Sequence, residues 1–212
     1  LDIPVIWTQH DCWAFTGGCT HFTYVNCNKW KSHCYNCPQL DRYPESLLFD
    51  NSKWMFSYKR KIFTNLKECR IVTVSKWLEN TVNESYLATY PVQTIENGVD
   101  TCTFKYTDSN LRDKYNLNKK IVILGVAASW NDRKGLKDFL KLRELLAKDL
   151  FEIVLIGLNE KQCEYVRELG VIGFKRTASK KELAEWYSVT DVFFNPSIEE
   201  TFGLVTAEAM AC

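Results

Sequence analysis

The chain has 212 residues, of which 46% are hydrophobic and 14% aromatic, and 27 basic against 26 acidic side chains give a formal net charge of +1. This composition supports a hydrophobic core and excludes a disordered chain. The near-neutral charge excludes a protein that binds nucleic acid through overall positive charge. No apolar run approaches the roughly 20 residues that a membrane-spanning helix needs. We therefore expect a soluble protein, or one attached to a membrane surface.

The first half of the chain combines predicted strands and helices with a cysteine-rich irregular stretch. It predicts strands at 3–8, 70–75 and 92–96, helices at 52–65 and 76–86, and a cysteine-rich irregular stretch up to about residue 43. The polar segment 106–120 follows and is typical of a linker with a short helix inside it. We therefore assign residues 1–105 to an N-terminal domain and 106–120 to an interdomain linker.

The second half alternates short apolar runs with amphipathic stretches. Strands are predicted at 121–127, 152–157, 171–174 and 191–196, and helices at 135–150, 159–169, 180–189 and 203–212. Ser179 and Glu182 have the spacing of a capping box, and Asn159 precedes another helix. Such strand–helix units indicate an α/β fold with a parallel sheet covered on both faces, and we assign residues 121–212 to a second domain.

The strongest motif lies at the end of the chain, in residues 196–211 with the sequence PSIEETFGLVTAEAMA. A parallel strand delivers it to the carboxyl edge of the sheet, where ligands bind in open α/β folds. The helix that starts near Gly203 offers backbone N–H groups to an anion. The carboxylates of Glu200 and Glu208 can contact the same ligand at two different points. The alternative is that Glu200 only stabilises the helix start and Glu208 is a solvated helix residue.

This string resembles the E-x7-E signature of retaining nucleotide-sugar glycosyltransferases of the GT-B fold, the group 1 type of bacterial polysaccharide biosynthesis. Four further segments resemble elements of that family in the expected order: TQHD at 8–11, VSKWL at 74–78, IENGVD at 95–100 and RKG at 133–135. The resemblance implies two Rossmann-like domains with parallel sheets, both incomplete in this chain. Because family members are nearly twice as long and the chain begins with Leu1, we expect a fragment with little or no activity alone.

The resemblance also implies roles for individual residues. In the family, the residue that matches Glu208 holds the ribose hydroxyls, and the one that matches Glu200 contacts the donor sugar. Lys134 matches the lysine that neutralises the phosphates, and Phe202, Gly203 and Leu204 match positions whose backbone meets the phosphates. Gly173 and Phe174 match the loop that contacts the base, and His10 matches a histidine that helps to position the sugar. Many relatives carry an arginine after the glycine that matches Gly125, whereas this chain has Val126. Arg133 either substitutes for that arginine or is an ordinary loop residue, and His10 has the alternative of a structural histidine.

The function implied is transfer of a hexose-type sugar from a UDP- or GDP-sugar to a glycan or lipid-linked acceptor in cell-surface polysaccharide or capsule biosynthesis. No catalytic metal is expected, because an ammonium group and helix N–H groups can stabilise the leaving diphosphate. We expect a cytoplasmic protein, or one peripheral to the inner face of the cytoplasmic membrane. The alternative is a non-catalytic nucleotide- or glycan-binding module.

The nine cysteines are unevenly distributed, with five of them in the first forty residues. Cys19, Cys27, Cys34 and Cys37 have spacings that suit a structural zinc site with four thiolates, and the last pair forms a C-x2-C knuckle. Four thiolates leave no open position, so a catalytic zinc is not expected. The alternatives are four reduced, partly buried thiols or two disulfides.

A basic run occupies residues 53–76, with seven basic residues against the single acid Glu68 and interleaved aromatic residues. One interpretation is contact with an anionic membrane surface or a lipid-linked acceptor. The other, which we favour from sequence, is a solvated amphipathic helix whose apolar side faces the core.

Overall fold

The computed structural model describes residues 3–42, 44–46 and 48–212. The chain forms two compact units. One unit ends at Asn97 and also takes in Glu199–Phe202, and the other comprises Gly98–Ile198 and Gly203–Cys212. Each unit has a parallel sheet of its own, so each is described separately.

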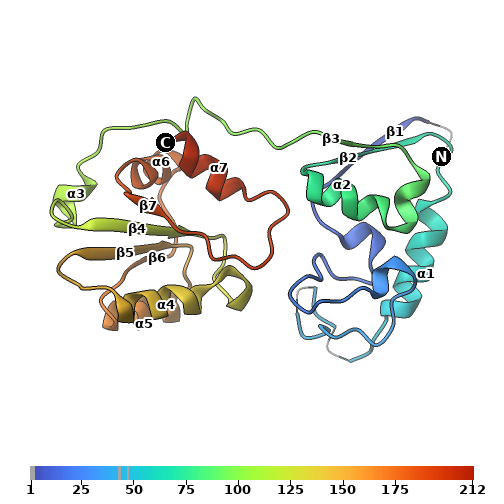
Figure 1. Ribbon diagram of the computed structural model, residues 1–212, viewed down its shortest axis with the longest axis horizontal. Helices are drawn as coiled ribbons and strands as arrows, with labels where there is room; N and C mark the ends of the chain where they lie inside the picture. Colours follow the sequence, from blue (N-terminus) through green and yellow to red (C-terminus); the bar gives the residue numbers. More distant parts are fainter. Residues whose placement is uncertain (1–2, 43, 47) are drawn as a thin grey trace. The chain divides into compact units, whose positions relative to one another are not determined.

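The first unit contains a three-stranded parallel sheet of order β1-β2-β3. Its strands are β1 (Val5–Gln9), β2 (Cys69–Thr73) and β3 (Val92–Thr94), and its helices are α1 (Ser52–Phe63) and α2 (Lys76–Asn83). Trp7 pairs with Ile71, which in turn pairs with Val92. The described part of the chain between β1 and α1, drawn in blue in Figure 1, runs as loops with two 3-10 helices, Trp13–Phe15 and Lys29–Lys31.

The core of the first unit depends on this irregular segment. Its residues Phe15, Phe22 and Trp30 are buried in this core. The centre of the Trp30 ring lies 4.6 Å from that of Phe22 and 5.5 Å from that of Phe15. Phe56 of α1 and Leu78 of α2 complete the same cluster. The irregular segment therefore carries much of the apolar surface that stabilises this unit.

The second unit is a four-stranded parallel sheet of order β6-β5-β4-β7. Its strands are β4 (Ile121–Val126), β5 (Phe151–Ile156), β6 (Ile172–Phe174) and β7 (Val192–Phe193), and its helices are α3 (Leu111–Lys114), α4 (Leu136–Leu145), α5 (Glu160–Glu168), α6 (Lys180–Ser188) and α7 (Leu204–Ala211). Figure 1 shows α4 and α5 on one face of the sheet and α6 and α7 on the other. This confirms the predicted parallel sheet covered on both faces.

The two faces of this sheet have separate cores. Val122 and Leu124 of β4 pack in the cluster that includes Trp186 of α6, whereas Ile123 packs in the cluster that includes Phe139 of α4. Successive side chains of a strand point to opposite faces, so a strand covered on both sides needs apolar residues at every position. This is why the run at 121–127 is continuously apolar.

The boundary between the units differs from the predicted linker. The division falls between Asn97 and Gly98, and residues 106–120 belong to the second unit. Phe104, Leu111 and Leu117 are buried in its core, and the Arg112 guanidinium donates to the Val189 carbonyl (3.0 Å). Polar composition suggested a linker because few apolar side chains, Leu111, Tyr115 and Leu117 among them, anchor the segment 106–120.

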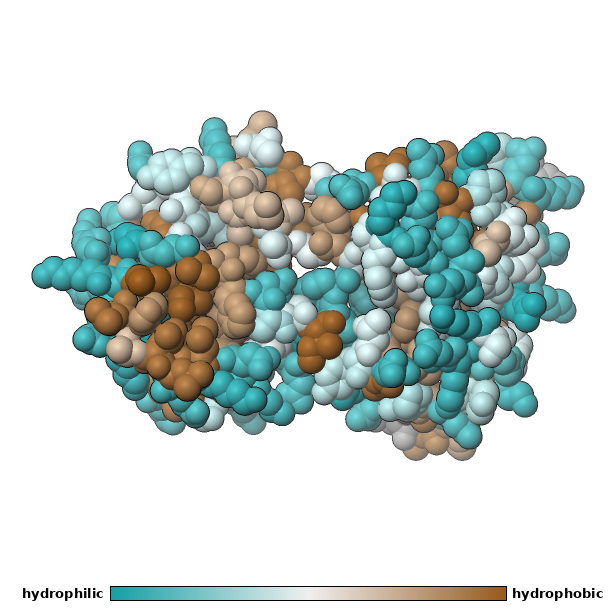
Figure 2. Space-filling view, in the orientation of Figure 1, coloured by the Kyte–Doolittle hydropathy of each residue, from teal (hydrophilic) through white to brown (hydrophobic). Residues whose placement is uncertain are grey.

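Two surface properties bear on function. Within the part of the chain that is described, no helix has the length and apolar character required to cross a membrane. In the view of Figure 2, hydrophobic residues gather in one patch on the unit that carries β4 to β7, with hydrophilic residues around it.

Candidate functional site

A basic loop follows β4, at residues 131–135. The Asn131 side chain accepts hydrogen bonds from the backbone N–H groups of Arg133 (3.0 Å) and Lys134 (3.1 Å), which fixes the turn. Gly135 has φ +76, in the left-handed region that favours glycine, and α4 begins directly after it. Both basic side chains are partly exposed. The predicted phosphate-binding pair thus lies on a turn held by its own asparagine.

A second loop, residues 195–198, leaves the neighbouring strand β7 and packs on the basic loop. The Ile198 N–H donates to the Arg133 carbonyl (2.9 Å), and a Cβ built on Gly135 would lie 2.5 Å from Pro196 Cγ. Because β4 and β7 are adjacent parallel strands, both loops leave the same edge of the sheet. The structure therefore brings Arg133 and Lys134 beside the segment that leads to the E-x7-E motif.

The start of α7 is fixed by Gly203 and Asn195. Gly203 has φ +83 and precedes the first helical residue, Leu204. The Asn195 amide donates to Thr206 Oγ1 (3.1 Å) and its carbonyl oxygen accepts from the Ser197 N–H (3.2 Å). Sequence reasoning missed Asn195 and Thr206, although an Asn-Pro pair directly after a strand is a turn signal that could have pointed to the first.

Glu208 lies within α7 and is half-buried. The Tyr187 hydroxyl donates to Glu208 Oε2 (3.3 Å). Burial raises the pKa of Glu208, while the Tyr187 hydrogen bond and the charge of Lys180 act in the opposite direction. The carboxylate is thus oriented by a residue that the sequence did not single out, and it has less solvent around it than a surface glutamate.

Gly173 and Phe174, the predicted base contacts, lie in β6. A Cβ on Gly173 would come within 2.7 Å of Val166 Cγ2, so this position needs glycine for the packing of α5 on the strand. The Phe174 ring packs against Tyr115 at 5.7 Å and Trp186 at 5.2 Å. Packing within the second unit accounts for both residues, and their contact with a base stays a prediction.

The remaining predicted site residues lie in the first unit. His10 is exposed and directly follows β1, as its position after a predicted strand required. Glu200 and Phe202 belong to the short segment that groups with this unit, and Phe202 packs against its core. The second unit therefore holds Arg133, Lys134, Gly203, Leu204 and Glu208, and the first unit holds His10, Glu200 and Phe202.

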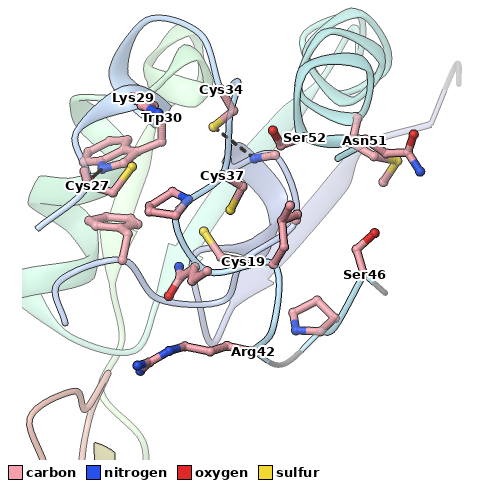
Figure 3. Close-up of a pocket in the computed structure, with 18 of the residues that line it drawn as sticks. Cys19, Cys27, Lys29, Trp30, Cys34, Cys37, Arg42, Ser46, Asn51 and Ser52 are labelled. Atoms are coloured by element: carbon pink, nitrogen blue, oxygen red, sulfur yellow. Dashed lines mark hydrogen bonds between the residues drawn. The ribbon is translucent and has the colours of Figure 1, made fainter. Parts of the chain in front are cut away.

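A separate feature of the first unit is a cavity of about 290 Å³ in the cysteine-rich segment. Cys19, Cys27, Cys34 and Cys37 all line it, and Figure 3 shows their sulfur atoms around one space. All nine cysteines of the chain are free thiols in the structure. Within residues 3–42, 44–46 and 48–212, no group of three or more His, Cys, Asp or Glu side chains is arranged to hold a metal ion.

The surroundings of these thiols are largely apolar. Burial raises the pKa of Cys34 to about 12 and also raises the pKa of Cys19 and Cys37. Lys59 of α1 is only 2% exposed, and its ammonium donates to the Trp13 carbonyl (2.5 Å) and lies 4.0 Å from the Trp13 ring centre. Burial lowers the pKa of Lys59 to about 8.

The second unit contains most of the residues that a protein-family model matches. Residues 118–212 match the family model described as glycosyl transferases group 1. WcaC of Escherichia coli K12, named for a glycosyl transferase of colanic acid biosynthesis, is 32% identical over 104 residues, which are 48% of this chain and 25% of that protein. A D-inositol 3-phosphate glycosyltransferase of Streptomyces bingchenggensis is 48% identical over 42 residues, 20% of this chain and 9% of that protein.

Solved structures resemble the whole chain in fold. Sucrose-phosphate synthase of Thermosynechococcus elongatus has a TM-score of 0.65 at 20% identity, over 98% of this chain and 48% of that one. Anabaena HepE, in complex with UDP, has a TM-score of 0.64 at 15% identity, over 99% of this chain and 51% of that one. The fold is the α/β GT-B type with parallel sheets. The chain spans about a quarter of the length of WcaC and about half that of these solved chains.

Proposed function

We propose that the protein is a retaining glycosyltransferase that moves a hexose-type sugar from a UDP- or GDP-sugar to a glycan or lipid-linked acceptor. The observation that carries this proposal is the pairing of two loops at one sheet edge, where the Ile198 N–H bonds to the Arg133 carbonyl beside Lys134. The family match over residues 118–212 supports it, as does HepE, a neighbour in fold that was solved with UDP-glucose. The relationship to WcaC favours cell-surface polysaccharide as the product class.

The chemistry follows from the charge that develops on the donor. As the bond between sugar and diphosphate breaks, negative charge accumulates on the leaving phosphate oxygens. Lys134 and Arg133 supply cationic groups there, and the N–H groups at the start of α7 point along a helix axis whose N-terminal end is positive. Glu208 accepts hydrogen bonds from the ribose hydroxyls, with its carboxylate oriented by Tyr187. These groups meet the need for charge stabilisation without a catalytic metal.

The remaining roles in this proposal fall on residues of both units. His10, exposed at the carboxyl end of β1, positions the donor sugar, and Glu200 contacts the sugar near the diphosphate. Gly173 and Phe174 contact the base, and Phe202, Gly203 and Leu204 meet the phosphates through their backbone. Each of these assignments comes from the matching family positions.

Turnover of nucleotide sugars tests the proposal. The protein as its own gene encodes it is incubated with UDP- and GDP-hexoses, and release of the nucleoside diphosphate is followed with a polysaccharide or lipid-linked acceptor present. We expect release from one donor, with loss of turnover but retained nucleotide binding in His10→Ala. Nucleotide binding without turnover on any acceptor would instead favour the non-catalytic binding module.

We also propose that α1 docks this protein on the inner face of an anionic membrane. The helix Ser52–Phe63 contains no acidic residue, and it exposes Trp54, Tyr58 and Ile62 at 61%, 49% and 42%. These positions are four residues apart and so form one stripe, in which the Trp54 and Tyr58 rings stack at 4.9 Å. Phe56 and Lys59 face the core instead. The stripe and the exposed Lys53, Arg60 and Lys61 suit an interfacial helix.

Vesicle sedimentation separates this docking from simple solvation of the helix. We expect binding to vesicles that contain phosphatidylglycerol and little binding to pure phosphatidylcholine, since each cation near an anionic surface contributes about 1 kcal/mol. Trp54→Ala with Tyr58→Ala should abolish sedimentation, whereas Tyr165→Ala, an exposed aromatic residue of α5, should leave it unchanged. Equal binding by all three proteins would show that α1 is only a solvated helix.

A further inference from the structure

Between β1 and α1 lies a long segment, residues 10–51, whose described residues have little of the regular structure that normally supports so long a stretch of chain. Its described part contains two three-residue 3-10 helices and no strand. Irregular stretches of this length inside a compact unit are uncommon. Nevertheless it buries Phe15, Phe22 and Trp30 in the core of the first unit. Something other than backbone ladders must hold it in place.

Cysteines gather where that support is needed. Four of the five cysteines of the segment line the cavity of about 290 Å³, whereas the fifth, Cys12, is buried in the core outside its lining. Figure 3 shows Cys19, Cys27, Cys34 and Cys37 around one space, although they are separated along the chain. The four cysteines beyond this segment, Cys69, Cys102, Cys163 and Cys212, do not line the cavity.

The C-x2-C turn is already shaped and held. Asn36, between the two cysteines, has φ +43, in the left-handed region that gives a tight turn. The Lys29 ammonium donates to the carbonyls of Tyr35 (2.9 Å) and Asn36 (2.8 Å), and the Cys37 N–H donates to Asp50 Oδ2 (2.9 Å). Cys34 and Cys37 are thereby presented to the same cavity from one turn.

A backbone N–H group also donates a hydrogen bond to one of the four sulfur atoms. The Gly17 N–H donates to Cys34 Sγ over 3.2 Å. A Cβ on Gly17 would lie 2.8 Å from the Cys34 Cβ and 2.7 Å from the Ser52 carbonyl oxygen, so only glycine allows this approach. Hydrogen bonds to ligand atoms orient metal ligands and stabilise the charged form of the ligand.

Two cations lie beside the cavity, where a charged centre would need them. A divalent ion with four thiolates has a net charge of −2, which is costly in an apolar setting unless it is compensated. Lys29 lines the cavity, and its ammonium donates to two carbonyls of the C-x2-C turn. The buried ammonium of Lys59 donates to the carbonyl of Trp13, another residue of the cavity lining. These two ammonium groups offset the negative charge of such a centre.

We propose that Cys19, Cys27, Cys34 and Cys37 bind one structural Zn²⁺ that holds the irregular segment in its fold. Four sulfur ligands in tetrahedral arrangement are typical of structural zinc sites. The four thiols surround the cavity without being gathered at metal distances, so they move inward when the ion enters. Each thiol gives up its proton, so one Zn²⁺ and four thiols yield the tetrathiolate centre and four protons. This inference does not depend on the proposed transfer reaction.

Native mass spectrometry of the reduced, full-length protein, purified without chelators from zinc-replete medium, tests this site. We expect a mass increase of one zinc per chain, lost on acidification. The double variant Cys34→Ser with Cys37→Ser should carry no zinc. Cys12→Ala, in the same segment but outside the cavity, and Cys102→Ser, an exposed cysteine of the second unit, should each retain one.

Cobalt substitution keeps the proposal testable if the double variant does not fold. The wild-type protein with Co²⁺ in place of Zn²⁺ should show the intense thiolate-to-cobalt absorption and the visible bands of a tetrahedral site with four sulfur ligands. Protein without metal, iron in place of zinc, zinc retained in full by the double variant, or two disulfides among these four cysteines would each overturn the assignment.

Discussion

At the scale of single residues, Glu208, for which we propose a binding role, is held at a cost to stability. Its carboxylate is half-buried in α7, where burial raises its pKa, and the Tyr187 hydroxyl donates to it over 3.3 Å. An acid with a raised pKa in the folded state stabilises the fold when protonated, and that contribution is lost as pH rises through the folded pKa. The proposed binding role would account for an ionisable group at this half-buried position.

Glu208→Gln should therefore stabilise the protein while weakening donor binding. The amide oxygen still accepts from Tyr187, and no charge is buried. We expect a gain of less than about 1 kcal/mol near neutral pH, because the side chain is partly solvated, and no gain at pH values below the ordinary carboxyl range. Thermal unfolding from pH 3 to 8 measures it. Glu164→Gln, an exposed position on α5, is the control and should show no such pH dependence; equal profiles for the two variants would contradict this account.

Sequence reasoning selected Lys134 and Glu208, but it missed Tyr187, the partner of Glu208, and both members of the pair Asn195 and Thr206. Lys134 and Glu208 stand in recognisable strings, so the resemblance was sufficient to select them. Tyr187 is 21 residues from Glu208, and Thr206 is 11 residues from Asn195. Such partners are set by the packing of α6 and α7, which a local pattern does not encode.

At the scale of elements, helix starts were more predictable than helix ends. Asn159 and Gln162 form a full capping box at α5, and Ser179 Oγ accepts from the Glu182 N–H (3.1 Å) at α6. The predicted helix at 135–150 instead ends at Leu145, because the Arg143 guanidinium donates to the Leu146 carbonyl (2.7 Å) and the chain turns there into β5. Capping is local chemistry, whereas this end depends on a tertiary contact.

The exposed stripe of α1 was also not evident from sequence. Hydrophobic residues at 54, 55, 56, 58, 62 and 63 surround much of the helix, so the pattern alone did not show which side would face the core. Packing resolved it in favour of Phe56 and Lys59, and a lysine is not a residue that periodicity selects for burial.

Gly135 packs against Pro196, so Gly135→Ala tests the contact between the loop at residues 131–135 and the loop at residues 195–198. An alanine there has to adopt a left-handed backbone, at about 1–2 kcal/mol, and its Cβ would also clash with Pro196. We expect a larger loss of unfolding free energy than this backbone cost, together with weaker donor binding. Chemical denaturation and nucleotide titration measure the two effects.

Gly170→Ala is the matched control for that substitution. Gly170 has φ +77, nearly that of Gly135, but the nearest atom to a Cβ there is the flexible Lys148 Nζ at 3.4 Å. This variant should show the backbone cost alone and unchanged nucleotide affinity. If both variants lose the same stability and neither loses affinity, the contact between Gly135 and Pro196 does not shape the site.

At the scale of the whole molecule, the two units have separate sheets and separate cores, which predicts two unfolding transitions rather than one. A ligand that binds only the folded form raises the stability of the unit to which it binds, by about 2.7 kcal/mol at a hundredfold excess over Kd. UDP or GDP should therefore raise the transition of the second unit more than that of the first, because Arg133, Lys134 and Glu208 lie in the second unit. Differential scanning calorimetry with and without nucleotide measures this. A shift of neither transition, or a larger shift of the first, would contradict a donor site in the second unit.

The domain class could be predicted at this scale, whereas the boundary could not. Short apolar runs that alternate with helices are sufficient to indicate a doubly covered parallel sheet. The segment 106–120 is polar at most positions, and its attachment through Leu111 and Leu117 emerges only when the core of the second unit is assembled. A linker and a surface element of a domain have similar compositions, so composition did not separate them.

The affinity of UDP and GDP for two lysine variants tests the central claim most directly. Lys134 lies on the basic loop beside Pro196, and Lys141 is exposed on α4, which follows the same loop. A charged hydrogen bond to phosphate contributes about 1.5–3 kcal/mol, so Lys134→Gln should weaken the preferred nucleotide about tenfold or more by isothermal titration calorimetry. Lys141→Gln, the same change of charge seven residues further on, should leave the affinity unchanged. Equal affinities for wild type and Lys134→Gln, or equal losses in both variants, would contradict a diphosphate site at this sheet edge.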